Sequence, residues 1–193
     1  RRRPPPPRRT VSIVATTRRL TLRELTTADA PFIWELVGDP DFIRFIGDRG
    51  VRSVDDAGQY LERGPFDMYA RHGFGLWGVE LKATGTPIGM CGLLKRDWLD
   101  DVDIGYALLP AFRGQGFAFE AARAVLTHAM DTLGLPRVAA IVSPGNEKSE
   151  ALLGRLGMTP RRRTASVSTK PLSRSTTSRR TATGRSSGTS TNT

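Results

Sequence analysis

The chain has 193 residues and a mass of 21.1 kDa, which allows one domain of ordinary size with additional segments at its ends. Its single cysteine excludes an internal disulfide framework and a cysteine-rich zinc site. No apolar run has the roughly 20 residues of a membrane-spanning helix, and no secretory signal is visible. We therefore expect a soluble cytoplasmic protein that binds neither a membrane nor a metal.

The positive charge of the chain is concentrated at its two ends. Residues 1–19 and 161–193 contain 15 of the 29 basic residues and none of the 19 acidic ones, so the stretch between them keeps 14 basic residues and has a net charge of −5, against +10 for the whole chain. Recognition of a nucleic acid requires basic residues that a fold holds along the phosphate backbone. Nucleic acid is therefore not expected as a partner, and binding through the arginine-rich ends is the alternative.

We predict one folded domain at residues 19–160 between two disordered ends. Residues 1–18 are rich in Arg and Pro, and residues 161–193 contain 17 Ser or Thr residues and few apolar ones. Such segments bury too little apolar surface to offset the entropy of ordering them. The composition changes abruptly near Arg161, which suggests a shift of the reading frame at that point. A basic tail that evolved for binding is the alternative.

The domain shows the periodicities of both strands and helices. In chain order, the predicted elements are a strand at 19–23, helices at 30–37 and 53–61, a strand hairpin at 74–82 and 88–95, a strand at 102–109, a helix at 118–133, a strand at 137–142 and a helix at 146–156. A strand meander followed by alternating strands and helices is typical of an α+β sandwich. No strand is expected after Arg161, so the C-terminal strands of the sheet would be missing and one sheet edge exposed.

Residues 108–118 join a predicted strand to the longest predicted helix through a turn that contains Gly114 and Gly116. Backbone N–H groups at a helix N-terminus lack internal partners and lie at the positive end of the helix dipole. Glycine lets a ligand approach that backbone closely, and phosphate is the ligand such a site favours. The segment lacks the Gly-Lys-Ser/Thr of a P-loop, and Phe119 replaces the third glycine of a dinucleotide fingerprint. A turn without a ligand remains the alternative for this stretch alone.

The spacing of Arg113, Gly116 and Ala118 resembles the acetyl-CoA pyrophosphate loop of the GNAT superfamily of N-acetyltransferases. The resemblance implies that acetyl-CoA is the co-substrate and that its pantetheine arm lies where the strand before the loop separates from its neighbour. The residues then expected at the cofactor are Leu108 and Leu109 along the arm, Arg113, Gly114, Gln115, Gly116, Phe117 and Ala118 at the pyrophosphate, and Asn146 and Ser149 beside the arm. From the residues alone, a helix cap is the alternative role for Asn146.

A second part of the chain indicates the same family. Asn146-Glu147-Lys148-Ser149 and the later Leu156-Gly157-Met158 are similar to a helix of the ribosomal-protein-alanine N-acetyltransferase-like (RimJ/RimL) branch. The strand at 19–23 and the segment Ile104-Gly105-Tyr106 also match this branch. The resemblance covers residues 20–158 and implies the GNAT fold, a mixed and mostly antiparallel sheet with helices on both faces.

In this family an amine attacks the thioester directly, so the protein must position the reactants, accept a proton and stabilise the oxyanion. Asp103 is the expected general base, with a solvated strand residue as the alternative, and Ser149 is the expected proton donor to the leaving thiolate. The strand at 137–142 contains no Glu, and Leu153 occupies the position where many relatives have a Tyr acid. Cys91 lies in an apolar strand, which favours a core thiol over an acyl carrier.

The resemblance thus implies an N-acetyltransferase that transfers acetyl from acetyl-CoA directly to an amine, either a protein N-terminus or a small molecule, and that is a monomer or a homodimer. The acidic domain favours a cationic acceptor. The alternative is a protein that binds acyl-CoA with impaired or no catalysis, because the Tyr and the Glu of relatives are absent.

Overall fold

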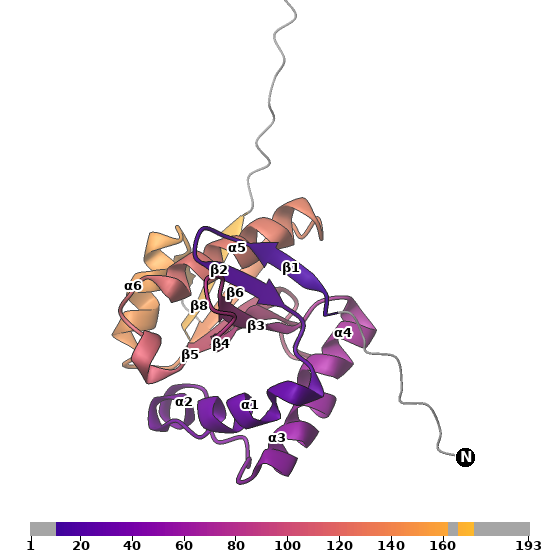
Figure 1. Cartoon of the computed structure of the whole chain (residues 1–193). Coiled ribbons are helices and arrows are strands. Elements are labelled where there is room, and N and C mark those ends of the chain that lie inside the picture. The colour runs from indigo at the N-terminus through magenta and orange to yellow at the C-terminus, as the bar shows by residue number, and fades with distance from the viewer. Residues whose placement is uncertain (1–10, 162–165, 172–193) are drawn as a thin grey trace, which may run out of the picture.

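A computed structural model of the chain describes residues 11–161 and 166–171, in which one mixed sheet is the central element (Figure 1). The strand order is β1-β2-β3-β4-β5-β6-β8-β7. The strands are β1 (Ile13–Thr16), β2 (Leu20–Arg23), β3 (Leu76–Leu81), β4 (Pro87–Leu94), β5 (Val102–Leu108), β6 (Arg137–Val142), β7 (Thr159–Arg161) and β8 (Ser166–Pro171). Of the described neighbouring pairs, β5 and β6 are parallel and the others antiparallel.

Helices cover both faces of the sheet (Figure 1). They are α1 (Ala30–Val37), α2 (Pro40–Phe45), α3 (Val54–Leu61), α4 (Asp67–His72), α5 (Phe117–Asp131) and α6 (Glu147–Arg155), with short turns η1 (Thr27–Asp29), η2 (Glu62–Phe66) and η3 (Pro110–Phe112). One apolar cluster joins α5 and α6 to the sheet, and a second joins α1 to α3 to it. Among the described residues, no helix combines the length and the apolar character needed to cross a bilayer.

The two faces of β5 meet different helices. Ile104 and Leu108 belong to the apolar cluster of α5 and α6, whereas Ala107 packs against the cluster of α1 to α3. This follows from the alternation of side chains along a strand, which places residues two apart on the same face. β5 is therefore covered on both sides, and a polar residue on it faces one helical layer or the other according to its position.

The predicted α+β class is confirmed, but the disordered N-terminal end is wrong for residues 13–16. They form β1 and pair antiparallel with β2. Ile13 and Val14 are β-branched residues, which fit a pleated strand, and β1 covers an edge of β2 that would otherwise have unpaired N–H and C=O groups. The arginine and proline composition of the preceding residues hid this short strand. Residues 1–10 lie outside the described residues.

The prediction that no strand follows Arg161 is also wrong. β8 pairs with β6 from Arg137↔Pro171 to Val142↔Ser166, and β7 pairs with the other edge of β8. Main-chain pairing does not require apolar side chains, and the outer edge of β6 would otherwise have unpaired N–H and C=O groups. Residues 162–165 and 172–193 lie outside the described residues, so the proposed shift of the reading frame stays a prediction.

Arg23 on β2 binds two carboxylates from different elements. Its guanidinium lies 2.8 Å from Asp29 (Nη2–Oδ1) and 2.6 Å from Glu80 of β3 (Nη2–Oε1). Asp29 is almost fully buried and also accepts the N–H of Thr26 at 2.7 Å. Burial by itself raises the pKa of Asp29, but the hydrogen bonds from Arg23 and Thr26 outweigh it and hold that pKa below its ordinary value. The network fastens the start of α1 to the sheet.

Replacing Arg23 with Met should destabilise the protein by about 3–5 kcal/mol at neutral pH, because two largely buried carboxylates lose their countercharge. The pKa of Asp29 is lowered in the folded state, so the ionised carboxylate contributes its full share of the folding stability above the ordinary pKa of 3.8. This stabilisation is lost as the pH falls through the lowered pKa. Urea unfolding at neutral pH and at about pH 3 should therefore show a stability gap between wild type and variant that narrows in acid. Arg52→Met, which removes an exposed pair with Asp48, is the control and should have little effect. An equal gap at both pH values would contradict the ion-pair explanation.

Candidate active site

β5 and β6 begin side by side and then separate. Their parallel pairing ends at Ile104↔Ala140, although β5 continues to Leu108 and β6 to Val142. Over this stretch each strand keeps its other neighbour, β4 for β5 and β8 for β6. The carboxyl ends of the two strands therefore enclose an opening in the sheet, which we call the β5–β6 gap. No strand of the described residues pairs with the edges that face it.

The loop after β5 leads from this gap into α5. Gly114 (φ 74°) and Gly116 (φ 81°) have left-handed backbone conformations that L side chains rarely adopt. Gly116 is the N-cap of α5, and the N–H of Glu120 donates to its carbonyl at 3.1 Å. Within the described part of the chain, none of the N–H groups of residues 114–119 donates to an acceptor. The loop thus presents consecutive free donors at the positive end of the helix dipole, as an anion-binding loop does.

The turn between β1 and β2 holds this loop in place. Arg19 donates through Nε to Glu120 Oε2 at 2.7 Å and through Nη1 to the carbonyl of Gln115 at 3.1 Å, and its guanidinium lies 4.3 Å from the centre of the Phe117 ring. Thr17 Oγ1 donates to the other oxygen of Glu120 at 2.6 Å. Burial by itself raises the pKa of Glu120, but these hydrogen bonds outweigh it and lower the pKa below its ordinary value. Arg19 and Glu120, which the sequence analysis does not single out, therefore fix the loop to the sheet.

Arg113 lies differently from what was expected. Its guanidinium binds Asp39, the N-cap of α2, and also Asp41 (Nη1–Oδ2, 2.7 Å). Its Nε donates to the carbonyl of Leu108 at 2.9 Å. That carbonyl points to the gap side, because the next N–H, of Leu109, donates to β4. The charge of Arg113 is already paired with two aspartates, so this side chain positions the loop instead of offering a free charge to a pyrophosphate.

Tyr106 belongs to the site although no sequence motif assigns it a role. Its hydroxyl lies 2.5 Å from Ser149 Oγ and so connects β5 to the first turn of α6. Burial raises the pKa of Tyr106 to about 12, so the hydroxyl keeps its proton at neutral pH. The side chain of Asn146 accepts the N–H of Ser149 at 3.2 Å, which is the helix-cap role. The signal in the sequence that could have identified Tyr106 is its position, because it precedes Leu108 by two residues and therefore lies on the same face of β5.

Asp103 lies at the closed end of the gap, one residue before the last β5–β6 pair. Its side chain is 1% exposed and accepts from Arg96 of the β4–β5 loop at 3.0 Å (Nε–Oδ1) and 3.2 Å (Nη2–Oδ2). Burial raises the pKa of Asp103, against the opposite effect of the ion pair. The alternative of a solvated strand residue is therefore wrong. Five residues, or about 17 Å of strand, separate Asp103 from Leu108, so the structure does not bring it to the glycine loop.

Asp103 and Tyr106 face opposite sides of the sheet. By alternation along β5, Asp103 shares its face with Ala107 and the α1 to α3 layer, whereas Tyr106 shares its face with Leu108 and the α5 and α6 layer. The β5–β6 gap lies between the two layers. A molecule in the gap could thus meet a buried carboxylate on one side and a pair of hydroxyls on the other.

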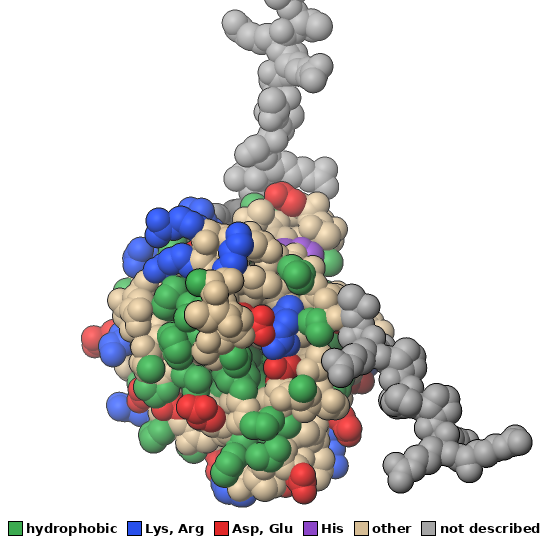
Figure 2. All heavy atoms as spheres, in the orientation of Figure 1, with side chains coloured by type: hydrophobic (Ala, Val, Ile, Leu, Met, Phe, Trp, Pro, Cys, Tyr) green, Lys and Arg blue, Asp and Glu red, His purple; other side chains and the backbone are tan. Residues whose placement is uncertain are grey.

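The surface between α6 and α2 carries gathered hydrophobic side chains on the face shown in Figure 2. Phe112, in the turn that follows β5, packs against both apolar clusters of the molecule. Exposed apolar surface of this kind commonly marks a contact with a ligand or a partner. The loop therefore lies beside apolar as well as hydrogen-bonding surface.

The sequence is similar to known proteins over most of its length. The family model described as an acetyltransferase (GNAT) domain matches residues 19–159. An uncharacterised N-acetyltransferase of Bacillus subtilis, YoaA, is 30% identical over 144 residues, which cover 73% of this chain and 80% of that protein. The residues that the family model matches contain β2 to β6 and the helices α1 to α6.

Solved structures share the arrangement as well. An acetyltransferase from Agrobacterium tumefaciens superposes with a TM-score of 0.71 at 29% identity, over 82% of this chain and 94% of that one. RimL, a ribosomal L7/L12 α-N-protein acetyltransferase solved with coenzyme A, gives a TM-score of 0.72 at 16% identity, over 83% of this chain and 98% of that one. At the latter identity the likeness concerns the fold.

Replacing Gly116 with Ala should destabilise the protein by about 1–2 kcal/mol, because an L residue is strained in the left-handed conformation. Crowding adds little, since a Cβ there would meet Arg19 Nη2 at 3.4 Å as its nearest neighbour. Gly58→Ala in α3, where φ is not positive and nothing lies within 4 Å, is the matched control and should stabilise by about 0.5–1 kcal/mol. Urea unfolding of both variants measures the difference. Equal effects would show that backbone conformation is not what requires glycine at 116.

Proposed function

Because the chain belongs to the GNAT acetyltransferase family, we propose that it transfers an acetyl group from acetyl-CoA directly to an amine, either at a protein N-terminus or on a small molecule. The observation that carries the proposal is the β5–β6 gap ending in a loop of free N–H groups. A gap between strands suits an extended arm, and the free donors suit a pyrophosphate. RimL, which shares the fold, was solved with coenzyme A.

The residues that would hold acetyl-CoA fit its chemistry. The N–H groups of residues 114–119 would bind the pyrophosphate oxygens, and the main chain of Gly105 to Leu108 would line the pantetheine arm. An arm that extends along these residues reaches the closed end of the gap, where Ile104 pairs with Ala140. The thioester would then lie beside Ile104, which follows Asp103 in the chain, and near the Tyr106–Ser149 pair.

In the proposed reaction, the amine nitrogen attacks the thioester carbonyl carbon, a C–N bond forms and the C–S bond breaks. Asp103 accepts the proton that the amine loses, directly or through water, and its raised pKa suits a base. The CoA thiolate takes a proton from Ser149, whose hydroxyl is hydrogen-bonded to that of Tyr106. Ser149 then regains a proton from water, and Asp103 returns the accepted proton to water. Tyr106 thus supplies a hydroxyl near the site although Leu153 stands where relatives have a Tyr and is buried.

Two observations favour direct transfer over an acyl-enzyme. Cys91 is fully buried, and burial raises the pKa of its thiol, so it is neither accessible nor ionised. Asp103 and Tyr106 lie on opposite faces of the sheet, so the proposed base and the proposed proton donor can each be reached from a different side. An acceptor on one face and the cofactor on the other can therefore be bound at the same time.

The cofactor assignment is tested by calorimetry with acetyl-CoA and with S-acetylpantetheine, which lacks the pyrophosphate. Wild type should bind acetyl-CoA at least about tenfold more tightly, because hydrogen bonds to a charged group contribute strongly. In Gly116→Val this preference should shrink, since a strained loop no longer aligns its donors, whereas Gly58→Ala should retain it. Equal affinity of wild type for the two compounds would remove the loop from the cofactor site.

The role of Asp103 is tested once an acceptor has been found by a mass-spectrometric screen of amines and peptides. Asp103→Asn should lower kcat by about 10²- to 10⁴-fold with little change in acetyl-CoA affinity, the range expected for loss of a general base. Because a base acts in its ionised form, the wild-type rate should fall as the pH drops through the raised pKa, and the variant should lack this limb. Asp101→Asn, which removes a pair with Arg137 at 3.1 Å, is the control and should keep the wild-type profile. Unchanged turnover in Asp103→Asn would assign the base elsewhere.

A further inference from the structure

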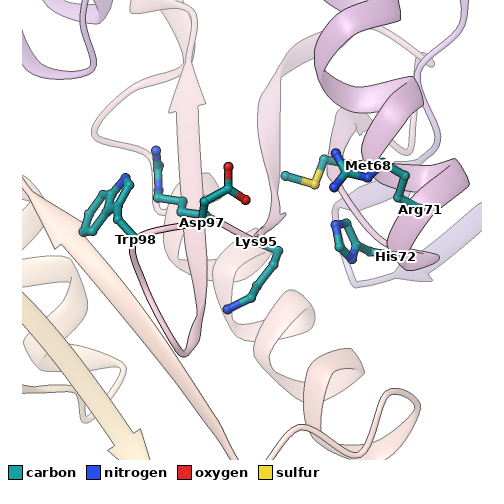
Figure 3. A pocket seen from close by; sticks show the side chains of 7 residues that line it. Met68, Arg71, His72, Lys95, Asp97 and Trp98 are labelled. Atoms are coloured by element: carbon teal, nitrogen blue, oxygen red, sulfur yellow. The ribbon is translucent and has the colours of Figure 1, made fainter.

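A pocket of about 490 Å³ lies between α4 and the β4–β5 loop (Figure 3). Met68, Arg71 and His72 of α4 form one wall, and Lys95, Arg96, Asp97 and Trp98 of the loop form the other. Figure 3 shows the two walls across the opening from each other. The pocket draws residues from two segments that are far apart in sequence, and no role proposed above uses it.

The pocket adjoins the proposed base through a single side chain. Arg96 lines the pocket and also donates two hydrogen bonds to Asp103, at 3.0 and 3.2 Å. Asp103 in turn lies one residue from the closed end of the β5–β6 gap. A molecule in this pocket is therefore next to the pair that would receive the proton of an attacking amine.

The lining is richer in cations than in anions. Lys95 Nζ donates to the carbonyl oxygens of Leu99 (2.6 Å) and Asp100 (2.7 Å), which are neutral, so its charge has no carboxylate partner among the described residues. Arg71 pairs with Asp67 within its own helix, but its side chain is 63% exposed. Exposed pairs of this kind contribute little, so a ligand can replace the partner at small cost. Asp97 is the acidic residue of the lining.

The walls also include surface suited to an organic molecule. Trp98 is 66% exposed, with the Arg96 guanidinium 5.9 Å from its ring centre, and Met68 lies on the opposite wall. An exposed Trp ring beside cationic side chains offers a flat apolar surface next to positive charge, as binding sites for organic anions do. The lining therefore suits a molecule with an apolar part better than an inorganic ion.

We propose that this pocket receives the acceptor and that the acceptor carries an anionic group, a carboxylate or a phosphate, close to its amine. Arg71 and Lys95 bind the anion while the amine lies toward Asp103. The inference rests on the proposed acetyl transfer and names its substrate class. It reverses the expectation from overall composition, which favoured a cationic acceptor, because the local lining differs in sign from the acidic domain as a whole.

The test compares matched amines with the full-length chain and acetyl-CoA. Alanyl-glutamate amide is paired with alanyl-glutamine amide, and phosphoethanolamine with ethanolamine, so that one arm reports on a carboxylate and the other on a phosphate. Wild type should show at least about a tenfold higher kcat/KM for the charged member of one pair, the gain expected from a charge-assisted hydrogen bond. Arg71→Gln should bring this ratio toward one. Arg63→Gln, an exposed arginine in η2 that does not line the pocket, should keep the wild-type ratio.

Failure of this inference is distinguishable from failure of the proposed function. Turnover with equal kcat/KM for charged and neutral members, or a preference that survives Arg71→Gln, would overturn the pocket as the acceptor site and leave acetyl transfer standing. A wild-type chain that neither binds acetyl-CoA nor releases CoA with any amine would overturn the proposed function itself. Thermal unfolding of Arg71→Gln and Arg63→Gln checks that both variants are folded before their ratios are compared.

Discussion

The end of the β5–β6 pairing at Ile104 is the constraint on which the candidate site depends. Two parallel strands that stayed paired to their ends would leave no opening in the sheet. β5 can diverge because β4 pairs with it as far as Leu108, and β6 can diverge because β8 pairs with it over its whole length. Without β8, the end of β6 beyond Ala140 would have unpaired backbone on both edges, which a buried strand does not tolerate. β8 therefore supports a site to which it contributes no proposed ligand.

The glycine loop at the open end is held from two sides while its donors stay free. Arg19 and Glu120 fasten it to the β1–β2 turn, and Arg113 fastens it to Asp39 at the start of α2. These contacts use side chains and carbonyl oxygens, so the N–H groups of residues 114–119 remain available. Donors that are oriented before a ligand arrives cost no reorganisation when it binds. The arginines of the loop region thus act on its shape, and the proposed anion site consists of main chain.

Charge is distributed around β5 in a way that separates the two proposed proton transfers. The carboxylate of Asp103 is buried beside Arg96 on one face, and the Tyr106 hydroxyl is bonded to Ser149 on the other. Burial raises both pKa values, which moves Asp103 toward the range of a useful base and keeps Tyr106 protonated. One strand can present both groups because its side chains alternate in direction. The helical layers would then differ in task, with α5 and α6 on the proposed cofactor side and α1 to α3 on the proposed acceptor side.

The sequence by itself determined the class of the fold and the position of the glycine loop. Periodicity locates β3 to β6, α1, α5 and α6, and the glycines at 114 and 116 mark a turn that only a left-handed backbone can make. Local patterns do not report which distant groups become partners. The tertiary structure alone decided that Arg113 binds Asp39 and Asp41, that Tyr106 meets Ser149, and that Arg96 covers Asp103. It also placed strands at 13–16 and 166–171, because an open sheet edge pairs through main-chain N–H and C=O groups, and a short segment beside arginine-rich or Ser/Thr-rich sequence carries these groups as well.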